Sequence, residues 1–75
     1  TAPADSRLFE ELRRWRRAKA EELDVPAYTI LHDSTLAAIA GTRPQSPEML
    51  AAIPGIGDVK LQRFGDELLA LVASS

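Results

Sequence analysis

Apolar residues recur at helical spacing through the first third of the chain. On a wheel of about 100° per residue, one face collects Phe9, Leu12, Arg16, Ala20 and Leu23. This face is flanked by Leu8, Trp15 and Lys19, and the opposite side is charged, with Glu10, Arg14, Arg17 and Glu21. We predict an amphipathic helix that Ser6 caps and that runs to about Asp24, because Pro26 cannot continue it.

Residues 25–31 form a connector that is too short for a full helix and is interrupted by Pro26. The pattern predicts an extended or single-turn segment. We expect its apolar side chains at Val25, Tyr28 and Ile30 to pin it to the core.

Two short helices follow. Asp33 or Ser34 is positioned to cap a helix over residues 35–40, with Leu36 and Ile39 facing inward and Gly41 at its end. After a loop, the Ser-Pro pair at 46–47 marks a second start, because proline is favoured in the first helical turn. The residues expected on its buried side are Met49, Leu50 and Ile53.

The segment 54–57, Pro-Gly-Ile-Gly, breaks that helix, and a last helix is expected from about Asp58 to Val72. Its apolar positions are Val59, Leu61, Phe64, Leu68, Leu69 and Val72. A glycine inside a helix costs about 1 kcal/mol relative to alanine, so we expect close packing at Gly65. The pattern predicts an all-α bundle of four to five helices with short loops, and no strand.

The length of 75 residues corresponds to one domain. We interpret residues 1–5 as the end of a linker and residues 6–75 as the folded unit. The chain has no cysteine and no apolar run of membrane-spanning length. Its formal net charge of −2 is unlike that of strong nucleic-acid binders, which are basic, so any contact with DNA must come from a local patch and be weak.

The ordered motifs of the chain resemble the HRDC family, named for helicases and RNase D. The resemblance rests on Leu-Arg-x-Trp-Arg at 12–16, Val-Pro-Ala-Tyr at 25–28 and Asp-Ser-Thr-Leu at 33–36. It continues through Pro44, Leu50, Ile56-Gly57, Lys60 and Phe64-Gly65, and it covers about Leu8 to Val72.

The resemblance implies a non-catalytic helical bundle, linked flexibly to a helicase core or an exoribonuclease, that tunes which nucleic-acid structures the parent enzyme engages. Bacterial RecQ forms look more similar than RNase D. The implied partners are single-stranded or branched DNA and the helicase core of the same chain, with the isolated domain a monomer. If the source is bacterial, a cytoplasmic, nucleoid-associated location is expected.

The first candidate DNA-contacting feature is the basic run along the first helix. Five cations, among them Arg13 and Arg17, could follow a phosphate backbone while Trp15 stacks on a base. The alternative is a solvated face of internal ion pairs, since Glu10–Arg14 and Arg17–Glu21 have the spacing for pairing. Arg16 points toward the core, where it needs a carboxylate or carbonyl partner. Trp15 is then half-buried packing.

The second candidate is the turn at residues 55–57, which resembles the hairpin of helix-hairpin-helix DNA-binding motifs. Gly55, Ile56 and Gly57 would present backbone N–H groups to a phosphate, with Lys60 one turn on and Arg63 on a neighbouring face. The negative charge of Asp58 opposes this, and the alternative is an ordinary tight turn between helices.

The third candidate is Tyr28, which follows a rigid Val-Pro-Ala stretch beside the basic helix. Its ring could stack on a base of single-stranded DNA. Alternatively, the ring fills the gap between the first helix and the bundle, with its hydroxyl hydrogen-bonded.

The fourth candidate is an acidic docking surface toward a basic face of the helicase. Its residues would be Glu21, Glu22, Asp24 and Asp33 around the first turn region, with Asp58, Asp66 and Glu67 on the last helix. The alternative is a solvated surface that keeps the domain soluble.

Catalysis is not expected from this chain alone. His32 is the single histidine, no cysteine exists, and the adjacent acidic pairs diverge on their helices. No phosphate-cradling Walker loop is present. We therefore expect no catalytic residue, no metal site and no cofactor.

Overall fold

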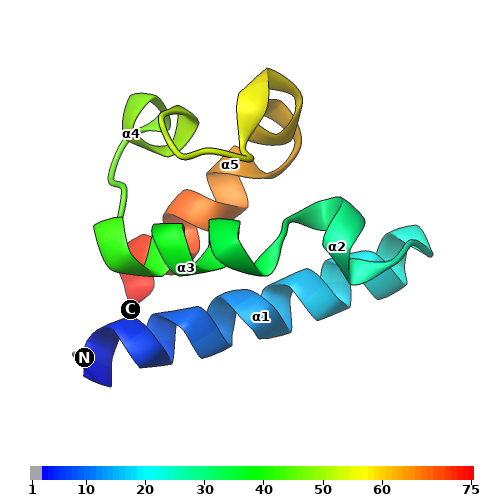
Figure 1. Cartoon of the computed structure of the whole chain (residues 1–75), viewed down its shortest axis with the longest axis horizontal. Helices are drawn as coiled ribbons and strands as arrows, with labels where there is room; N and C mark the ends of the chain where they lie inside the picture. Colours follow the sequence, from blue (N-terminus) through cyan, green and yellow to red (C-terminus); the bar gives the residue numbers. More distant parts are fainter. Residues whose placement is uncertain (1–2) are drawn as a thin grey trace.

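The computed structural model describes residues 3–75, with side chains from Arg7 onward. Within this range the chain is all-α and contains no strand, as predicted. Its helices are α1 (Pro3–Leu23), α2 (Ala27–Ile30), α3 (Asp33–Thr42), α4 (Pro47–Ala51) and α5 (Gly57–Ser74). The long helix α1 runs along one side, α3 lies against it, and α4 sits on the far side of α3 (Figure 1).

Helix α1 begins earlier than predicted. It starts at Pro3, so Ser6 lies inside the helix and the expectation that Ser6 caps it is wrong. Proline suits a first helical position because its missing N–H would have no helical partner there. The predicted linker, residues 1–5, lies partly outside the described residues, and its boundary with the domain stays a prediction.

Helix α1 ends in a two-bond C-terminal cap. The N–H of Val25 bonds to the carbonyl of Ala20 and the N–H of Asp24 to that of Glu21, which is the Schellman pattern. Asp24 takes the left-handed conformation, with φ of 57°, where glycine is usual. Pro26 follows, so the predicted end of the helix near Asp24 is confirmed.

The core is formed mainly by α1, α3 and α5, with Leu50 of α4 and residues of the connecting turns. Leu8, Leu12, Leu36, Ile39, Leu50 and Leu68 are completely buried. Leu8 was expected only on the flank of α1, and Leu23, expected on the buried face, is 37% exposed. Because α1 packs against both α3 and α5, burial extends to Leu8 at the edge of the predicted face, whereas Leu23 is the last residue of the helix.

Other expected core residues lie at the surface. Ile30, Leu50 and Ile53 are buried as predicted, but the exposed fractions of Val25, Tyr28, Met49 and Val59 are 38%, 63%, 49% and 67%. The helices α2 and α4 are one turn long or little more, so each turns few side chains inward. Val59 lies in the first turn of α5, ahead of that helix's buried positions Phe64, Leu68 and Val72.

The starts of the short helices follow partly from local sequence. The predicted start at Ser46-Pro47 is confirmed, since the Ser46 hydroxyl accepts a bond from the N–H of Met49 at 3.2 Å. Helix α3 is longer than predicted, and its N-cap is His32 rather than Asp33 or Ser34. The carbonyl of His32 accepts bonds from the N–H groups of Thr35 and Leu36.

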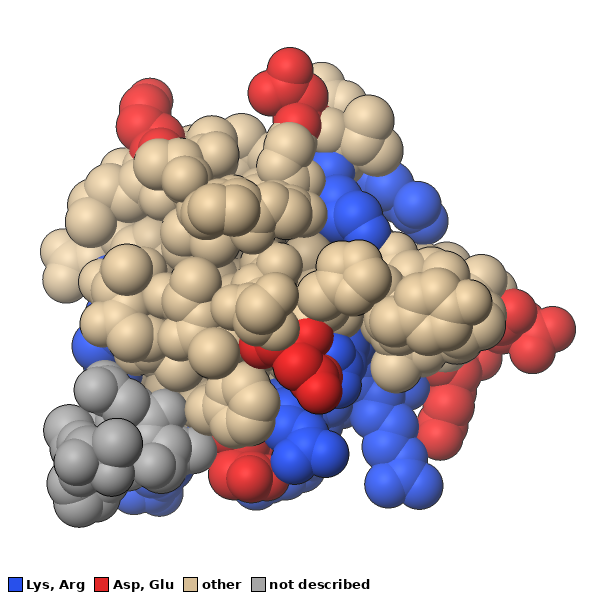
Figure 2. Space-filling model, viewed as in Figure 1, with Lys and Arg blue, Asp and Glu red and all other residues tan. Residues whose placement is uncertain are grey.

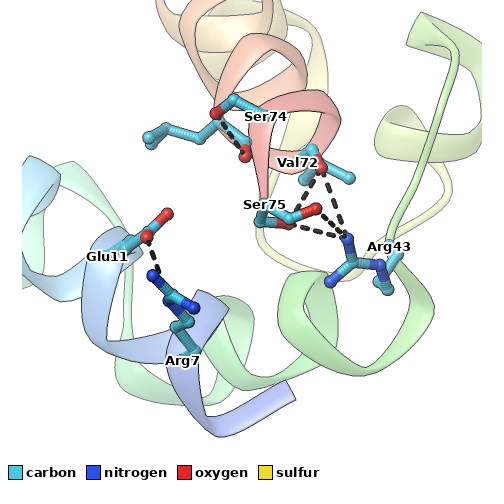
Figure 3. Close-up of polar contacts among 7 residues, drawn as sticks. Arg7, Glu11, Arg43, Val72, Ser74 and Ser75 are labelled. Atoms are coloured by element: carbon cyan, nitrogen blue, oxygen red, sulfur yellow. Dashed lines mark hydrogen bonds and ion pairs between the residues drawn. The ribbon is translucent and has the colours of Figure 1, made fainter. Parts of the chain in front are cut away.

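Arg43 joins the ends of α3 and α5. Gly41 was expected to end α3, but the helix continues to Thr42 and Arg43 takes the left-handed cap position, with φ of 49°. Its Nη2 donates to the Ser75 hydroxyl at 2.7 Å and to the Ser75 carbonyl at 3.1 Å (Figure 3). A cation at the carboxyl end of α5 also complements the helix dipole.

The turn before α5, at residues 54–56, packs closely against Thr35 of α3. Gly55 has φ of +98°, and a Cβ at this position would lie 2.3 Å from the Oγ1 of Thr35. Thr35 is itself 4% exposed, and its hydroxyl donates to the Pro54 carbonyl at 3.2 Å. At Gly65, a Cβ would lie 3.1 Å from Leu61 of the same helix and 3.9 Å from Leu50 of α4.

A polar clamp joins α1 to α5. The indole N–H of Trp15 donates to Glu67 Oε1 at 3.0 Å, and Lys19 Nζ donates to Glu67 Oε2 at 3.1 Å. The Trp15 ring meets Phe64 edge-on, with ring centroids 5.5 Å apart. The bond from Trp15, reinforced by that from Lys19, holds the pKa of Glu67 below its ordinary value. The same bond to Glu67 raises the pKa of Lys19.

We predict that Gly55→Ala destabilises the fold by about 2–4 kcal/mol, because a left-handed alanine is strained and its Cβ collides with Thr35. Urea unfolding followed by circular dichroism measures the change. The matched control is Gly41→Ala, since Gly41 is helical and a Cβ there meets nothing within 4 Å. This control should gain about 0.5–1 kcal/mol. Equal midpoints for both variants would contradict a turn constrained by Thr35.

We also predict that the clamp weakens in acid. A carboxyl whose folded pKa is depressed stabilises the fold fully above its unfolded pKa, and this contribution is lost as the pH falls through the folded pKa. The contribution of Lys19, whose pKa is raised, is lost only at alkaline pH. Urea unfolding between about pH 6 and about pH 3 should therefore show a larger loss of stability for the wild type than for Glu67→Gln.

Asp66→Asn is the control for the acid experiment, because Asp66 is exposed and has no ion pair among the described residues. It should keep the pH dependence of the wild type. An unchanged pH dependence in Glu67→Gln would show that the clamp does not couple to folding.

Candidate nucleic-acid interface

Arg16 fixes the junction between α2 and α3 against α1. Its Nη1 donates to the Leu31 carbonyl at 2.9 Å and lies 2.7 Å from Asp33 Oδ1. The side chain is only 12% exposed. The prediction that this guanidinium needs a carboxylate or carbonyl partner is confirmed. Arg16 therefore stabilises the fold, and the carboxylate of Asp33 is already paired with it.

Besides Arg7 near its start, α1 carries three more exposed arginines. Arg13 is 53% exposed, lies 4.0 Å from Glu10 and stands over the Phe9 ring. Arg17 is 83% exposed and lies 3.6 Å from Glu21, the predicted pair. The predicted Glu10–Arg14 pair does not form, and Arg14 has no ion-pair partner within the described part of the chain. Exposed pairs contribute about 0–1 kcal/mol, so a phosphate can compete for all three cations.

These arginines line one end of a groove between α1 and α2. A hollow of about 320 Å³ is lined by Glu10, Arg13, Arg14, Arg16, Arg17 and Ala27. A wider hollow of about 560 Å³ lies next to it and is lined by Arg16, Ala27, Tyr28, His32, Asp33 and Ser34. Arg16 and Ala27 border both, so the two hollows are neighbours, and we refer to the pair as the α1–α2 groove. Figure 2 shows basic side chains over α1, below α2, with acidic side chains between and beside them.

Tyr28 stands at the wide end of the α1–α2 groove. With 63% of its surface exposed, it does not fill the gap between α1 and the bundle, and that expectation is wrong. An exposed ring beside cations has the composition of a single-strand stacking platform. The groove also contains His32 and Ser34, which the sequence pattern did not assign to DNA contact because they lie on a different element from the basic run.

Trp15 is not a stacking platform. It is half-buried, packed on Phe64 and hydrogen-bonded to Glu67, which confirms the packing interpretation. Lys19, 15% exposed, is held by Glu67 and Glu22. The basic run of α1 therefore supplies fewer free cations than the sequence suggests.

The turn at 55–57 lies apart from the α1–α2 groove. Ile56 is 1% exposed and belongs to the core, and Thr35 accounts for the requirement for Gly55. Gly57 has φ of +62° with open space where a Cβ would be, but Asp58 lies in the first turn of α5. The residues predicted to bind DNA thus fall into two separate groups.

Lys60 and Arg63 also have contacts within the fold. Lys60 Nζ donates to the carbonyls of Thr29 at 2.5 Å and Ile30 at 2.6 Å, at the end of α2. The Arg63 guanidinium stands 5.1 Å from the centre of the Phe64 ring. Lys60 therefore stabilises the carboxyl end of the turn that carries Tyr28.

Some of the acidic residues predicted for docking have ion-pair partners within the domain and others do not. Glu21, Glu22 and Asp33 pair with Arg17, Lys19 and Arg16. Asp24, Asp58 and Asp66 are exposed and have no ion pair among the described residues.

Over the described residues, no group of three His, Asp or Glu side chains has a geometry suited to a metal ion. No helix in this range is long and apolar enough to cross a membrane.

Comparison with known proteins places this fold in a family. The HRDC domain family matches residues 5–72. The ATP-dependent DNA helicase UvrD2 of Mycobacterium tuberculosis (strain H37Rv) is 45% identical over 71 residues, which cover 95% of this chain and 10% of UvrD2. The ATP-dependent DNA helicase RecQ of Haemophilus influenzae is 37% identical over 68 residues, 91% of this chain and 11% of RecQ.

Ribonuclease D of Granulibacter bethesdensis is also related, at 33% identity over 69 residues, 91% of this chain and 18% of that enzyme. Among solved structures, HRDC domain 3 of RecQ from D. radiodurans superimposes with a TM-score of 0.89 at 28% identity, covering 93% of this chain and 92% of that one. The chain spans about a tenth of the helicases it matches. The match over residues 5–72 and the shared all-α fold confirm the predicted resemblance: the chain belongs to the HRDC domain family.

Proposed function

We propose that this chain is an accessory domain of a DNA helicase and contacts single-stranded or branched DNA weakly through the α1–α2 groove. The observation that carries the proposal is that the hollow lined by Arg13, Arg14 and Arg17 shares a border with the hollow lined by the exposed ring of Tyr28. Cations along a path, ending at an aromatic platform, match the needs of a flexible strand. ATP hydrolysis and strand separation would belong to the rest of the helicase chain.

The charges of the domain set the strength expected of this contact. The formal net charge is −2, and Arg13 and Arg17 exchange a carboxylate partner for a phosphate on binding. Each phosphate neutralised on a single strand contributes a slope of about −0.7 in the salt dependence of binding. Two or three such contacts give weak binding that strengthens at low salt, which suits a domain that adjusts the substrate choice of a stronger DNA-binding core.

Docking on the helicase core of the same chain is the second candidate. It is favoured by Asp24, Asp58 and Asp66, whose exposed carboxylates have no ion pair among the described residues, and by the negative net charge. The similarity to Ribonuclease D leaves an exoribonuclease parent as a further alternative, in which RNA would occupy the groove.

We propose that the isolated domain is a monomer. For a bacterial source, we propose that the protein is cytoplasmic and associated with the nucleoid.

We predict that Tyr28→Ala weakens binding to a thymidine oligonucleotide about five-fold or more, because stacking contributes about 1–3 kcal/mol per base. Tyr28→Phe should retain most of the affinity, since the ring remains. Arg17→Ala should lower affinity and reduce the salt slope by about 0.7. Fluorescence anisotropy of the 75-residue chain at low and physiological salt measures these changes.

Arg7→Ala is the matched control for charge. Arg7 lies on the same helix, is 82% exposed and pairs with Glu11, but it does not line the α1–α2 groove. Equal losses for Arg7→Ala and Arg17→Ala would mean general attraction without a defined site. Absence of binding at low salt would overturn direct DNA contact and favour docking on the helicase core.

A further inference from the structure

A second hollow lies where the end of α1, the α2 turn and the first turns of α5 meet. Its volume is about 340 Å³, near the lower end of the range of about 300–1,000 Å³ for ligand pockets. Its apolar walls include Leu23, Val25, Val59 and Phe64, and its cations are Lys60 and Arg63. It shares no residue with the α1–α2 groove, and we call it the α1–α5 hollow.

The apolar side chains of the α1–α5 hollow are exposed together. Leu23, Val25 and Val59 are 37%, 38% and 67% exposed, and they converge although Val59 lies more than thirty residues further along the chain. Single exposed apolar residues are ordinary, whereas a group around a hollow indicates a contact surface. An incoming apolar side chain would be covered on several sides at once.

The charged side chains that line this hollow are of one sign. Its walls, among the described residues, contain Lys60 and Arg63 and no carboxylate. Lys60 is already held by two carbonyls of α2, so its ammonium is fixed in place before any partner arrives. Arg63 is exposed and rests on the Phe64 ring. Figure 2 shows blue side chains in the gap between the start of α5 and α2.

This composition fits a peptide better than a nucleic acid. Base recognition by a single-strand site needs an open aromatic face, but Phe64 is 4% exposed and is covered by Trp15 and Arg63. The remaining walls are aliphatic. An aliphatic hollow with cations at its edge complements a chain segment in which carboxylates flank a large apolar side chain.

We propose that the α1–α5 hollow binds a short acidic peptide segment of a partner protein, with an apolar side chain in the hollow and carboxylates on Lys60 and Arg63. The surface is separate from the proposed DNA groove, so one domain can hold a strand and a protein partner together. The proposal does not depend on DNA binding by the groove.

The test uses a fluorescein-labelled hexapeptide, with a leucine–phenylalanine pair between two pairs of aspartates, titrated with the 75-residue chain in an anisotropy assay. Val59→Ser and Arg63→Glu should each weaken binding about five-fold or more. Both residues are exposed, so the folded state should survive these changes, and circular dichroism verifies this. Tyr28→Ala should leave peptide binding unchanged.

Met49→Ser and Arg7→Glu are the matched controls, because these residues are exposed and lie outside the hollow. A peptide with serines in place of the apolar pair should bind at least about five-fold more weakly. Peptide binding that is absent, or equally reduced by the controls, would overturn the proposal. So would a loss of oligonucleotide affinity, rather than peptide affinity, in Val59→Ser and Arg63→Glu.

Discussion

The largely buried guanidinium of Arg16 is the contact on which the proposed DNA-binding groove depends. A guanidinium that is only 12% exposed must be paired, because an unpaired charge in the interior costs several kcal/mol. Its partners are the Leu31 carbonyl and Asp33, which lie just after α2 and at the start of α3. This pairing holds the α2–α3 junction on α1, and Tyr28 therefore stands beside the exposed arginines of the same helix.

The same helix divides its cations between structure and surface. Arg16 and Lys19 are largely buried and serve the packing of α1 against its neighbours, while Arg13, Arg14 and Arg17 face solvent. This division leaves a local group of exposed cations on a chain of net charge −2. The proposed DNA contact would rest on three cations and one ring, which suits a domain that adjusts the substrate choice of a helicase core.

Local sequence signals predicted the helices well and the surface poorly. Ser46 and Pro47 identified the start of α4 because capping and proline act within one turn. Met49 and Val59 were wrongly expected inside, since in a short helix or a first turn the tertiary neighbours decide burial. The bond from Arg43 to Ser75 spans 32 positions, and the α1–α2 groove joins separate elements, so no local pattern could predict either.

An NMR titration of the isotope-labelled chain with a thymidine oligonucleotide tests the central claim most directly. If the α1–α2 groove is the strand-binding surface, amide shifts should concentrate at residues 13–17 and 27–34 and leave residues 55–57 unchanged. Shifts confined to residues 55–63 would place the strand on the turn and α5 instead. Either that result or an absence of shifts at low salt would contradict the account.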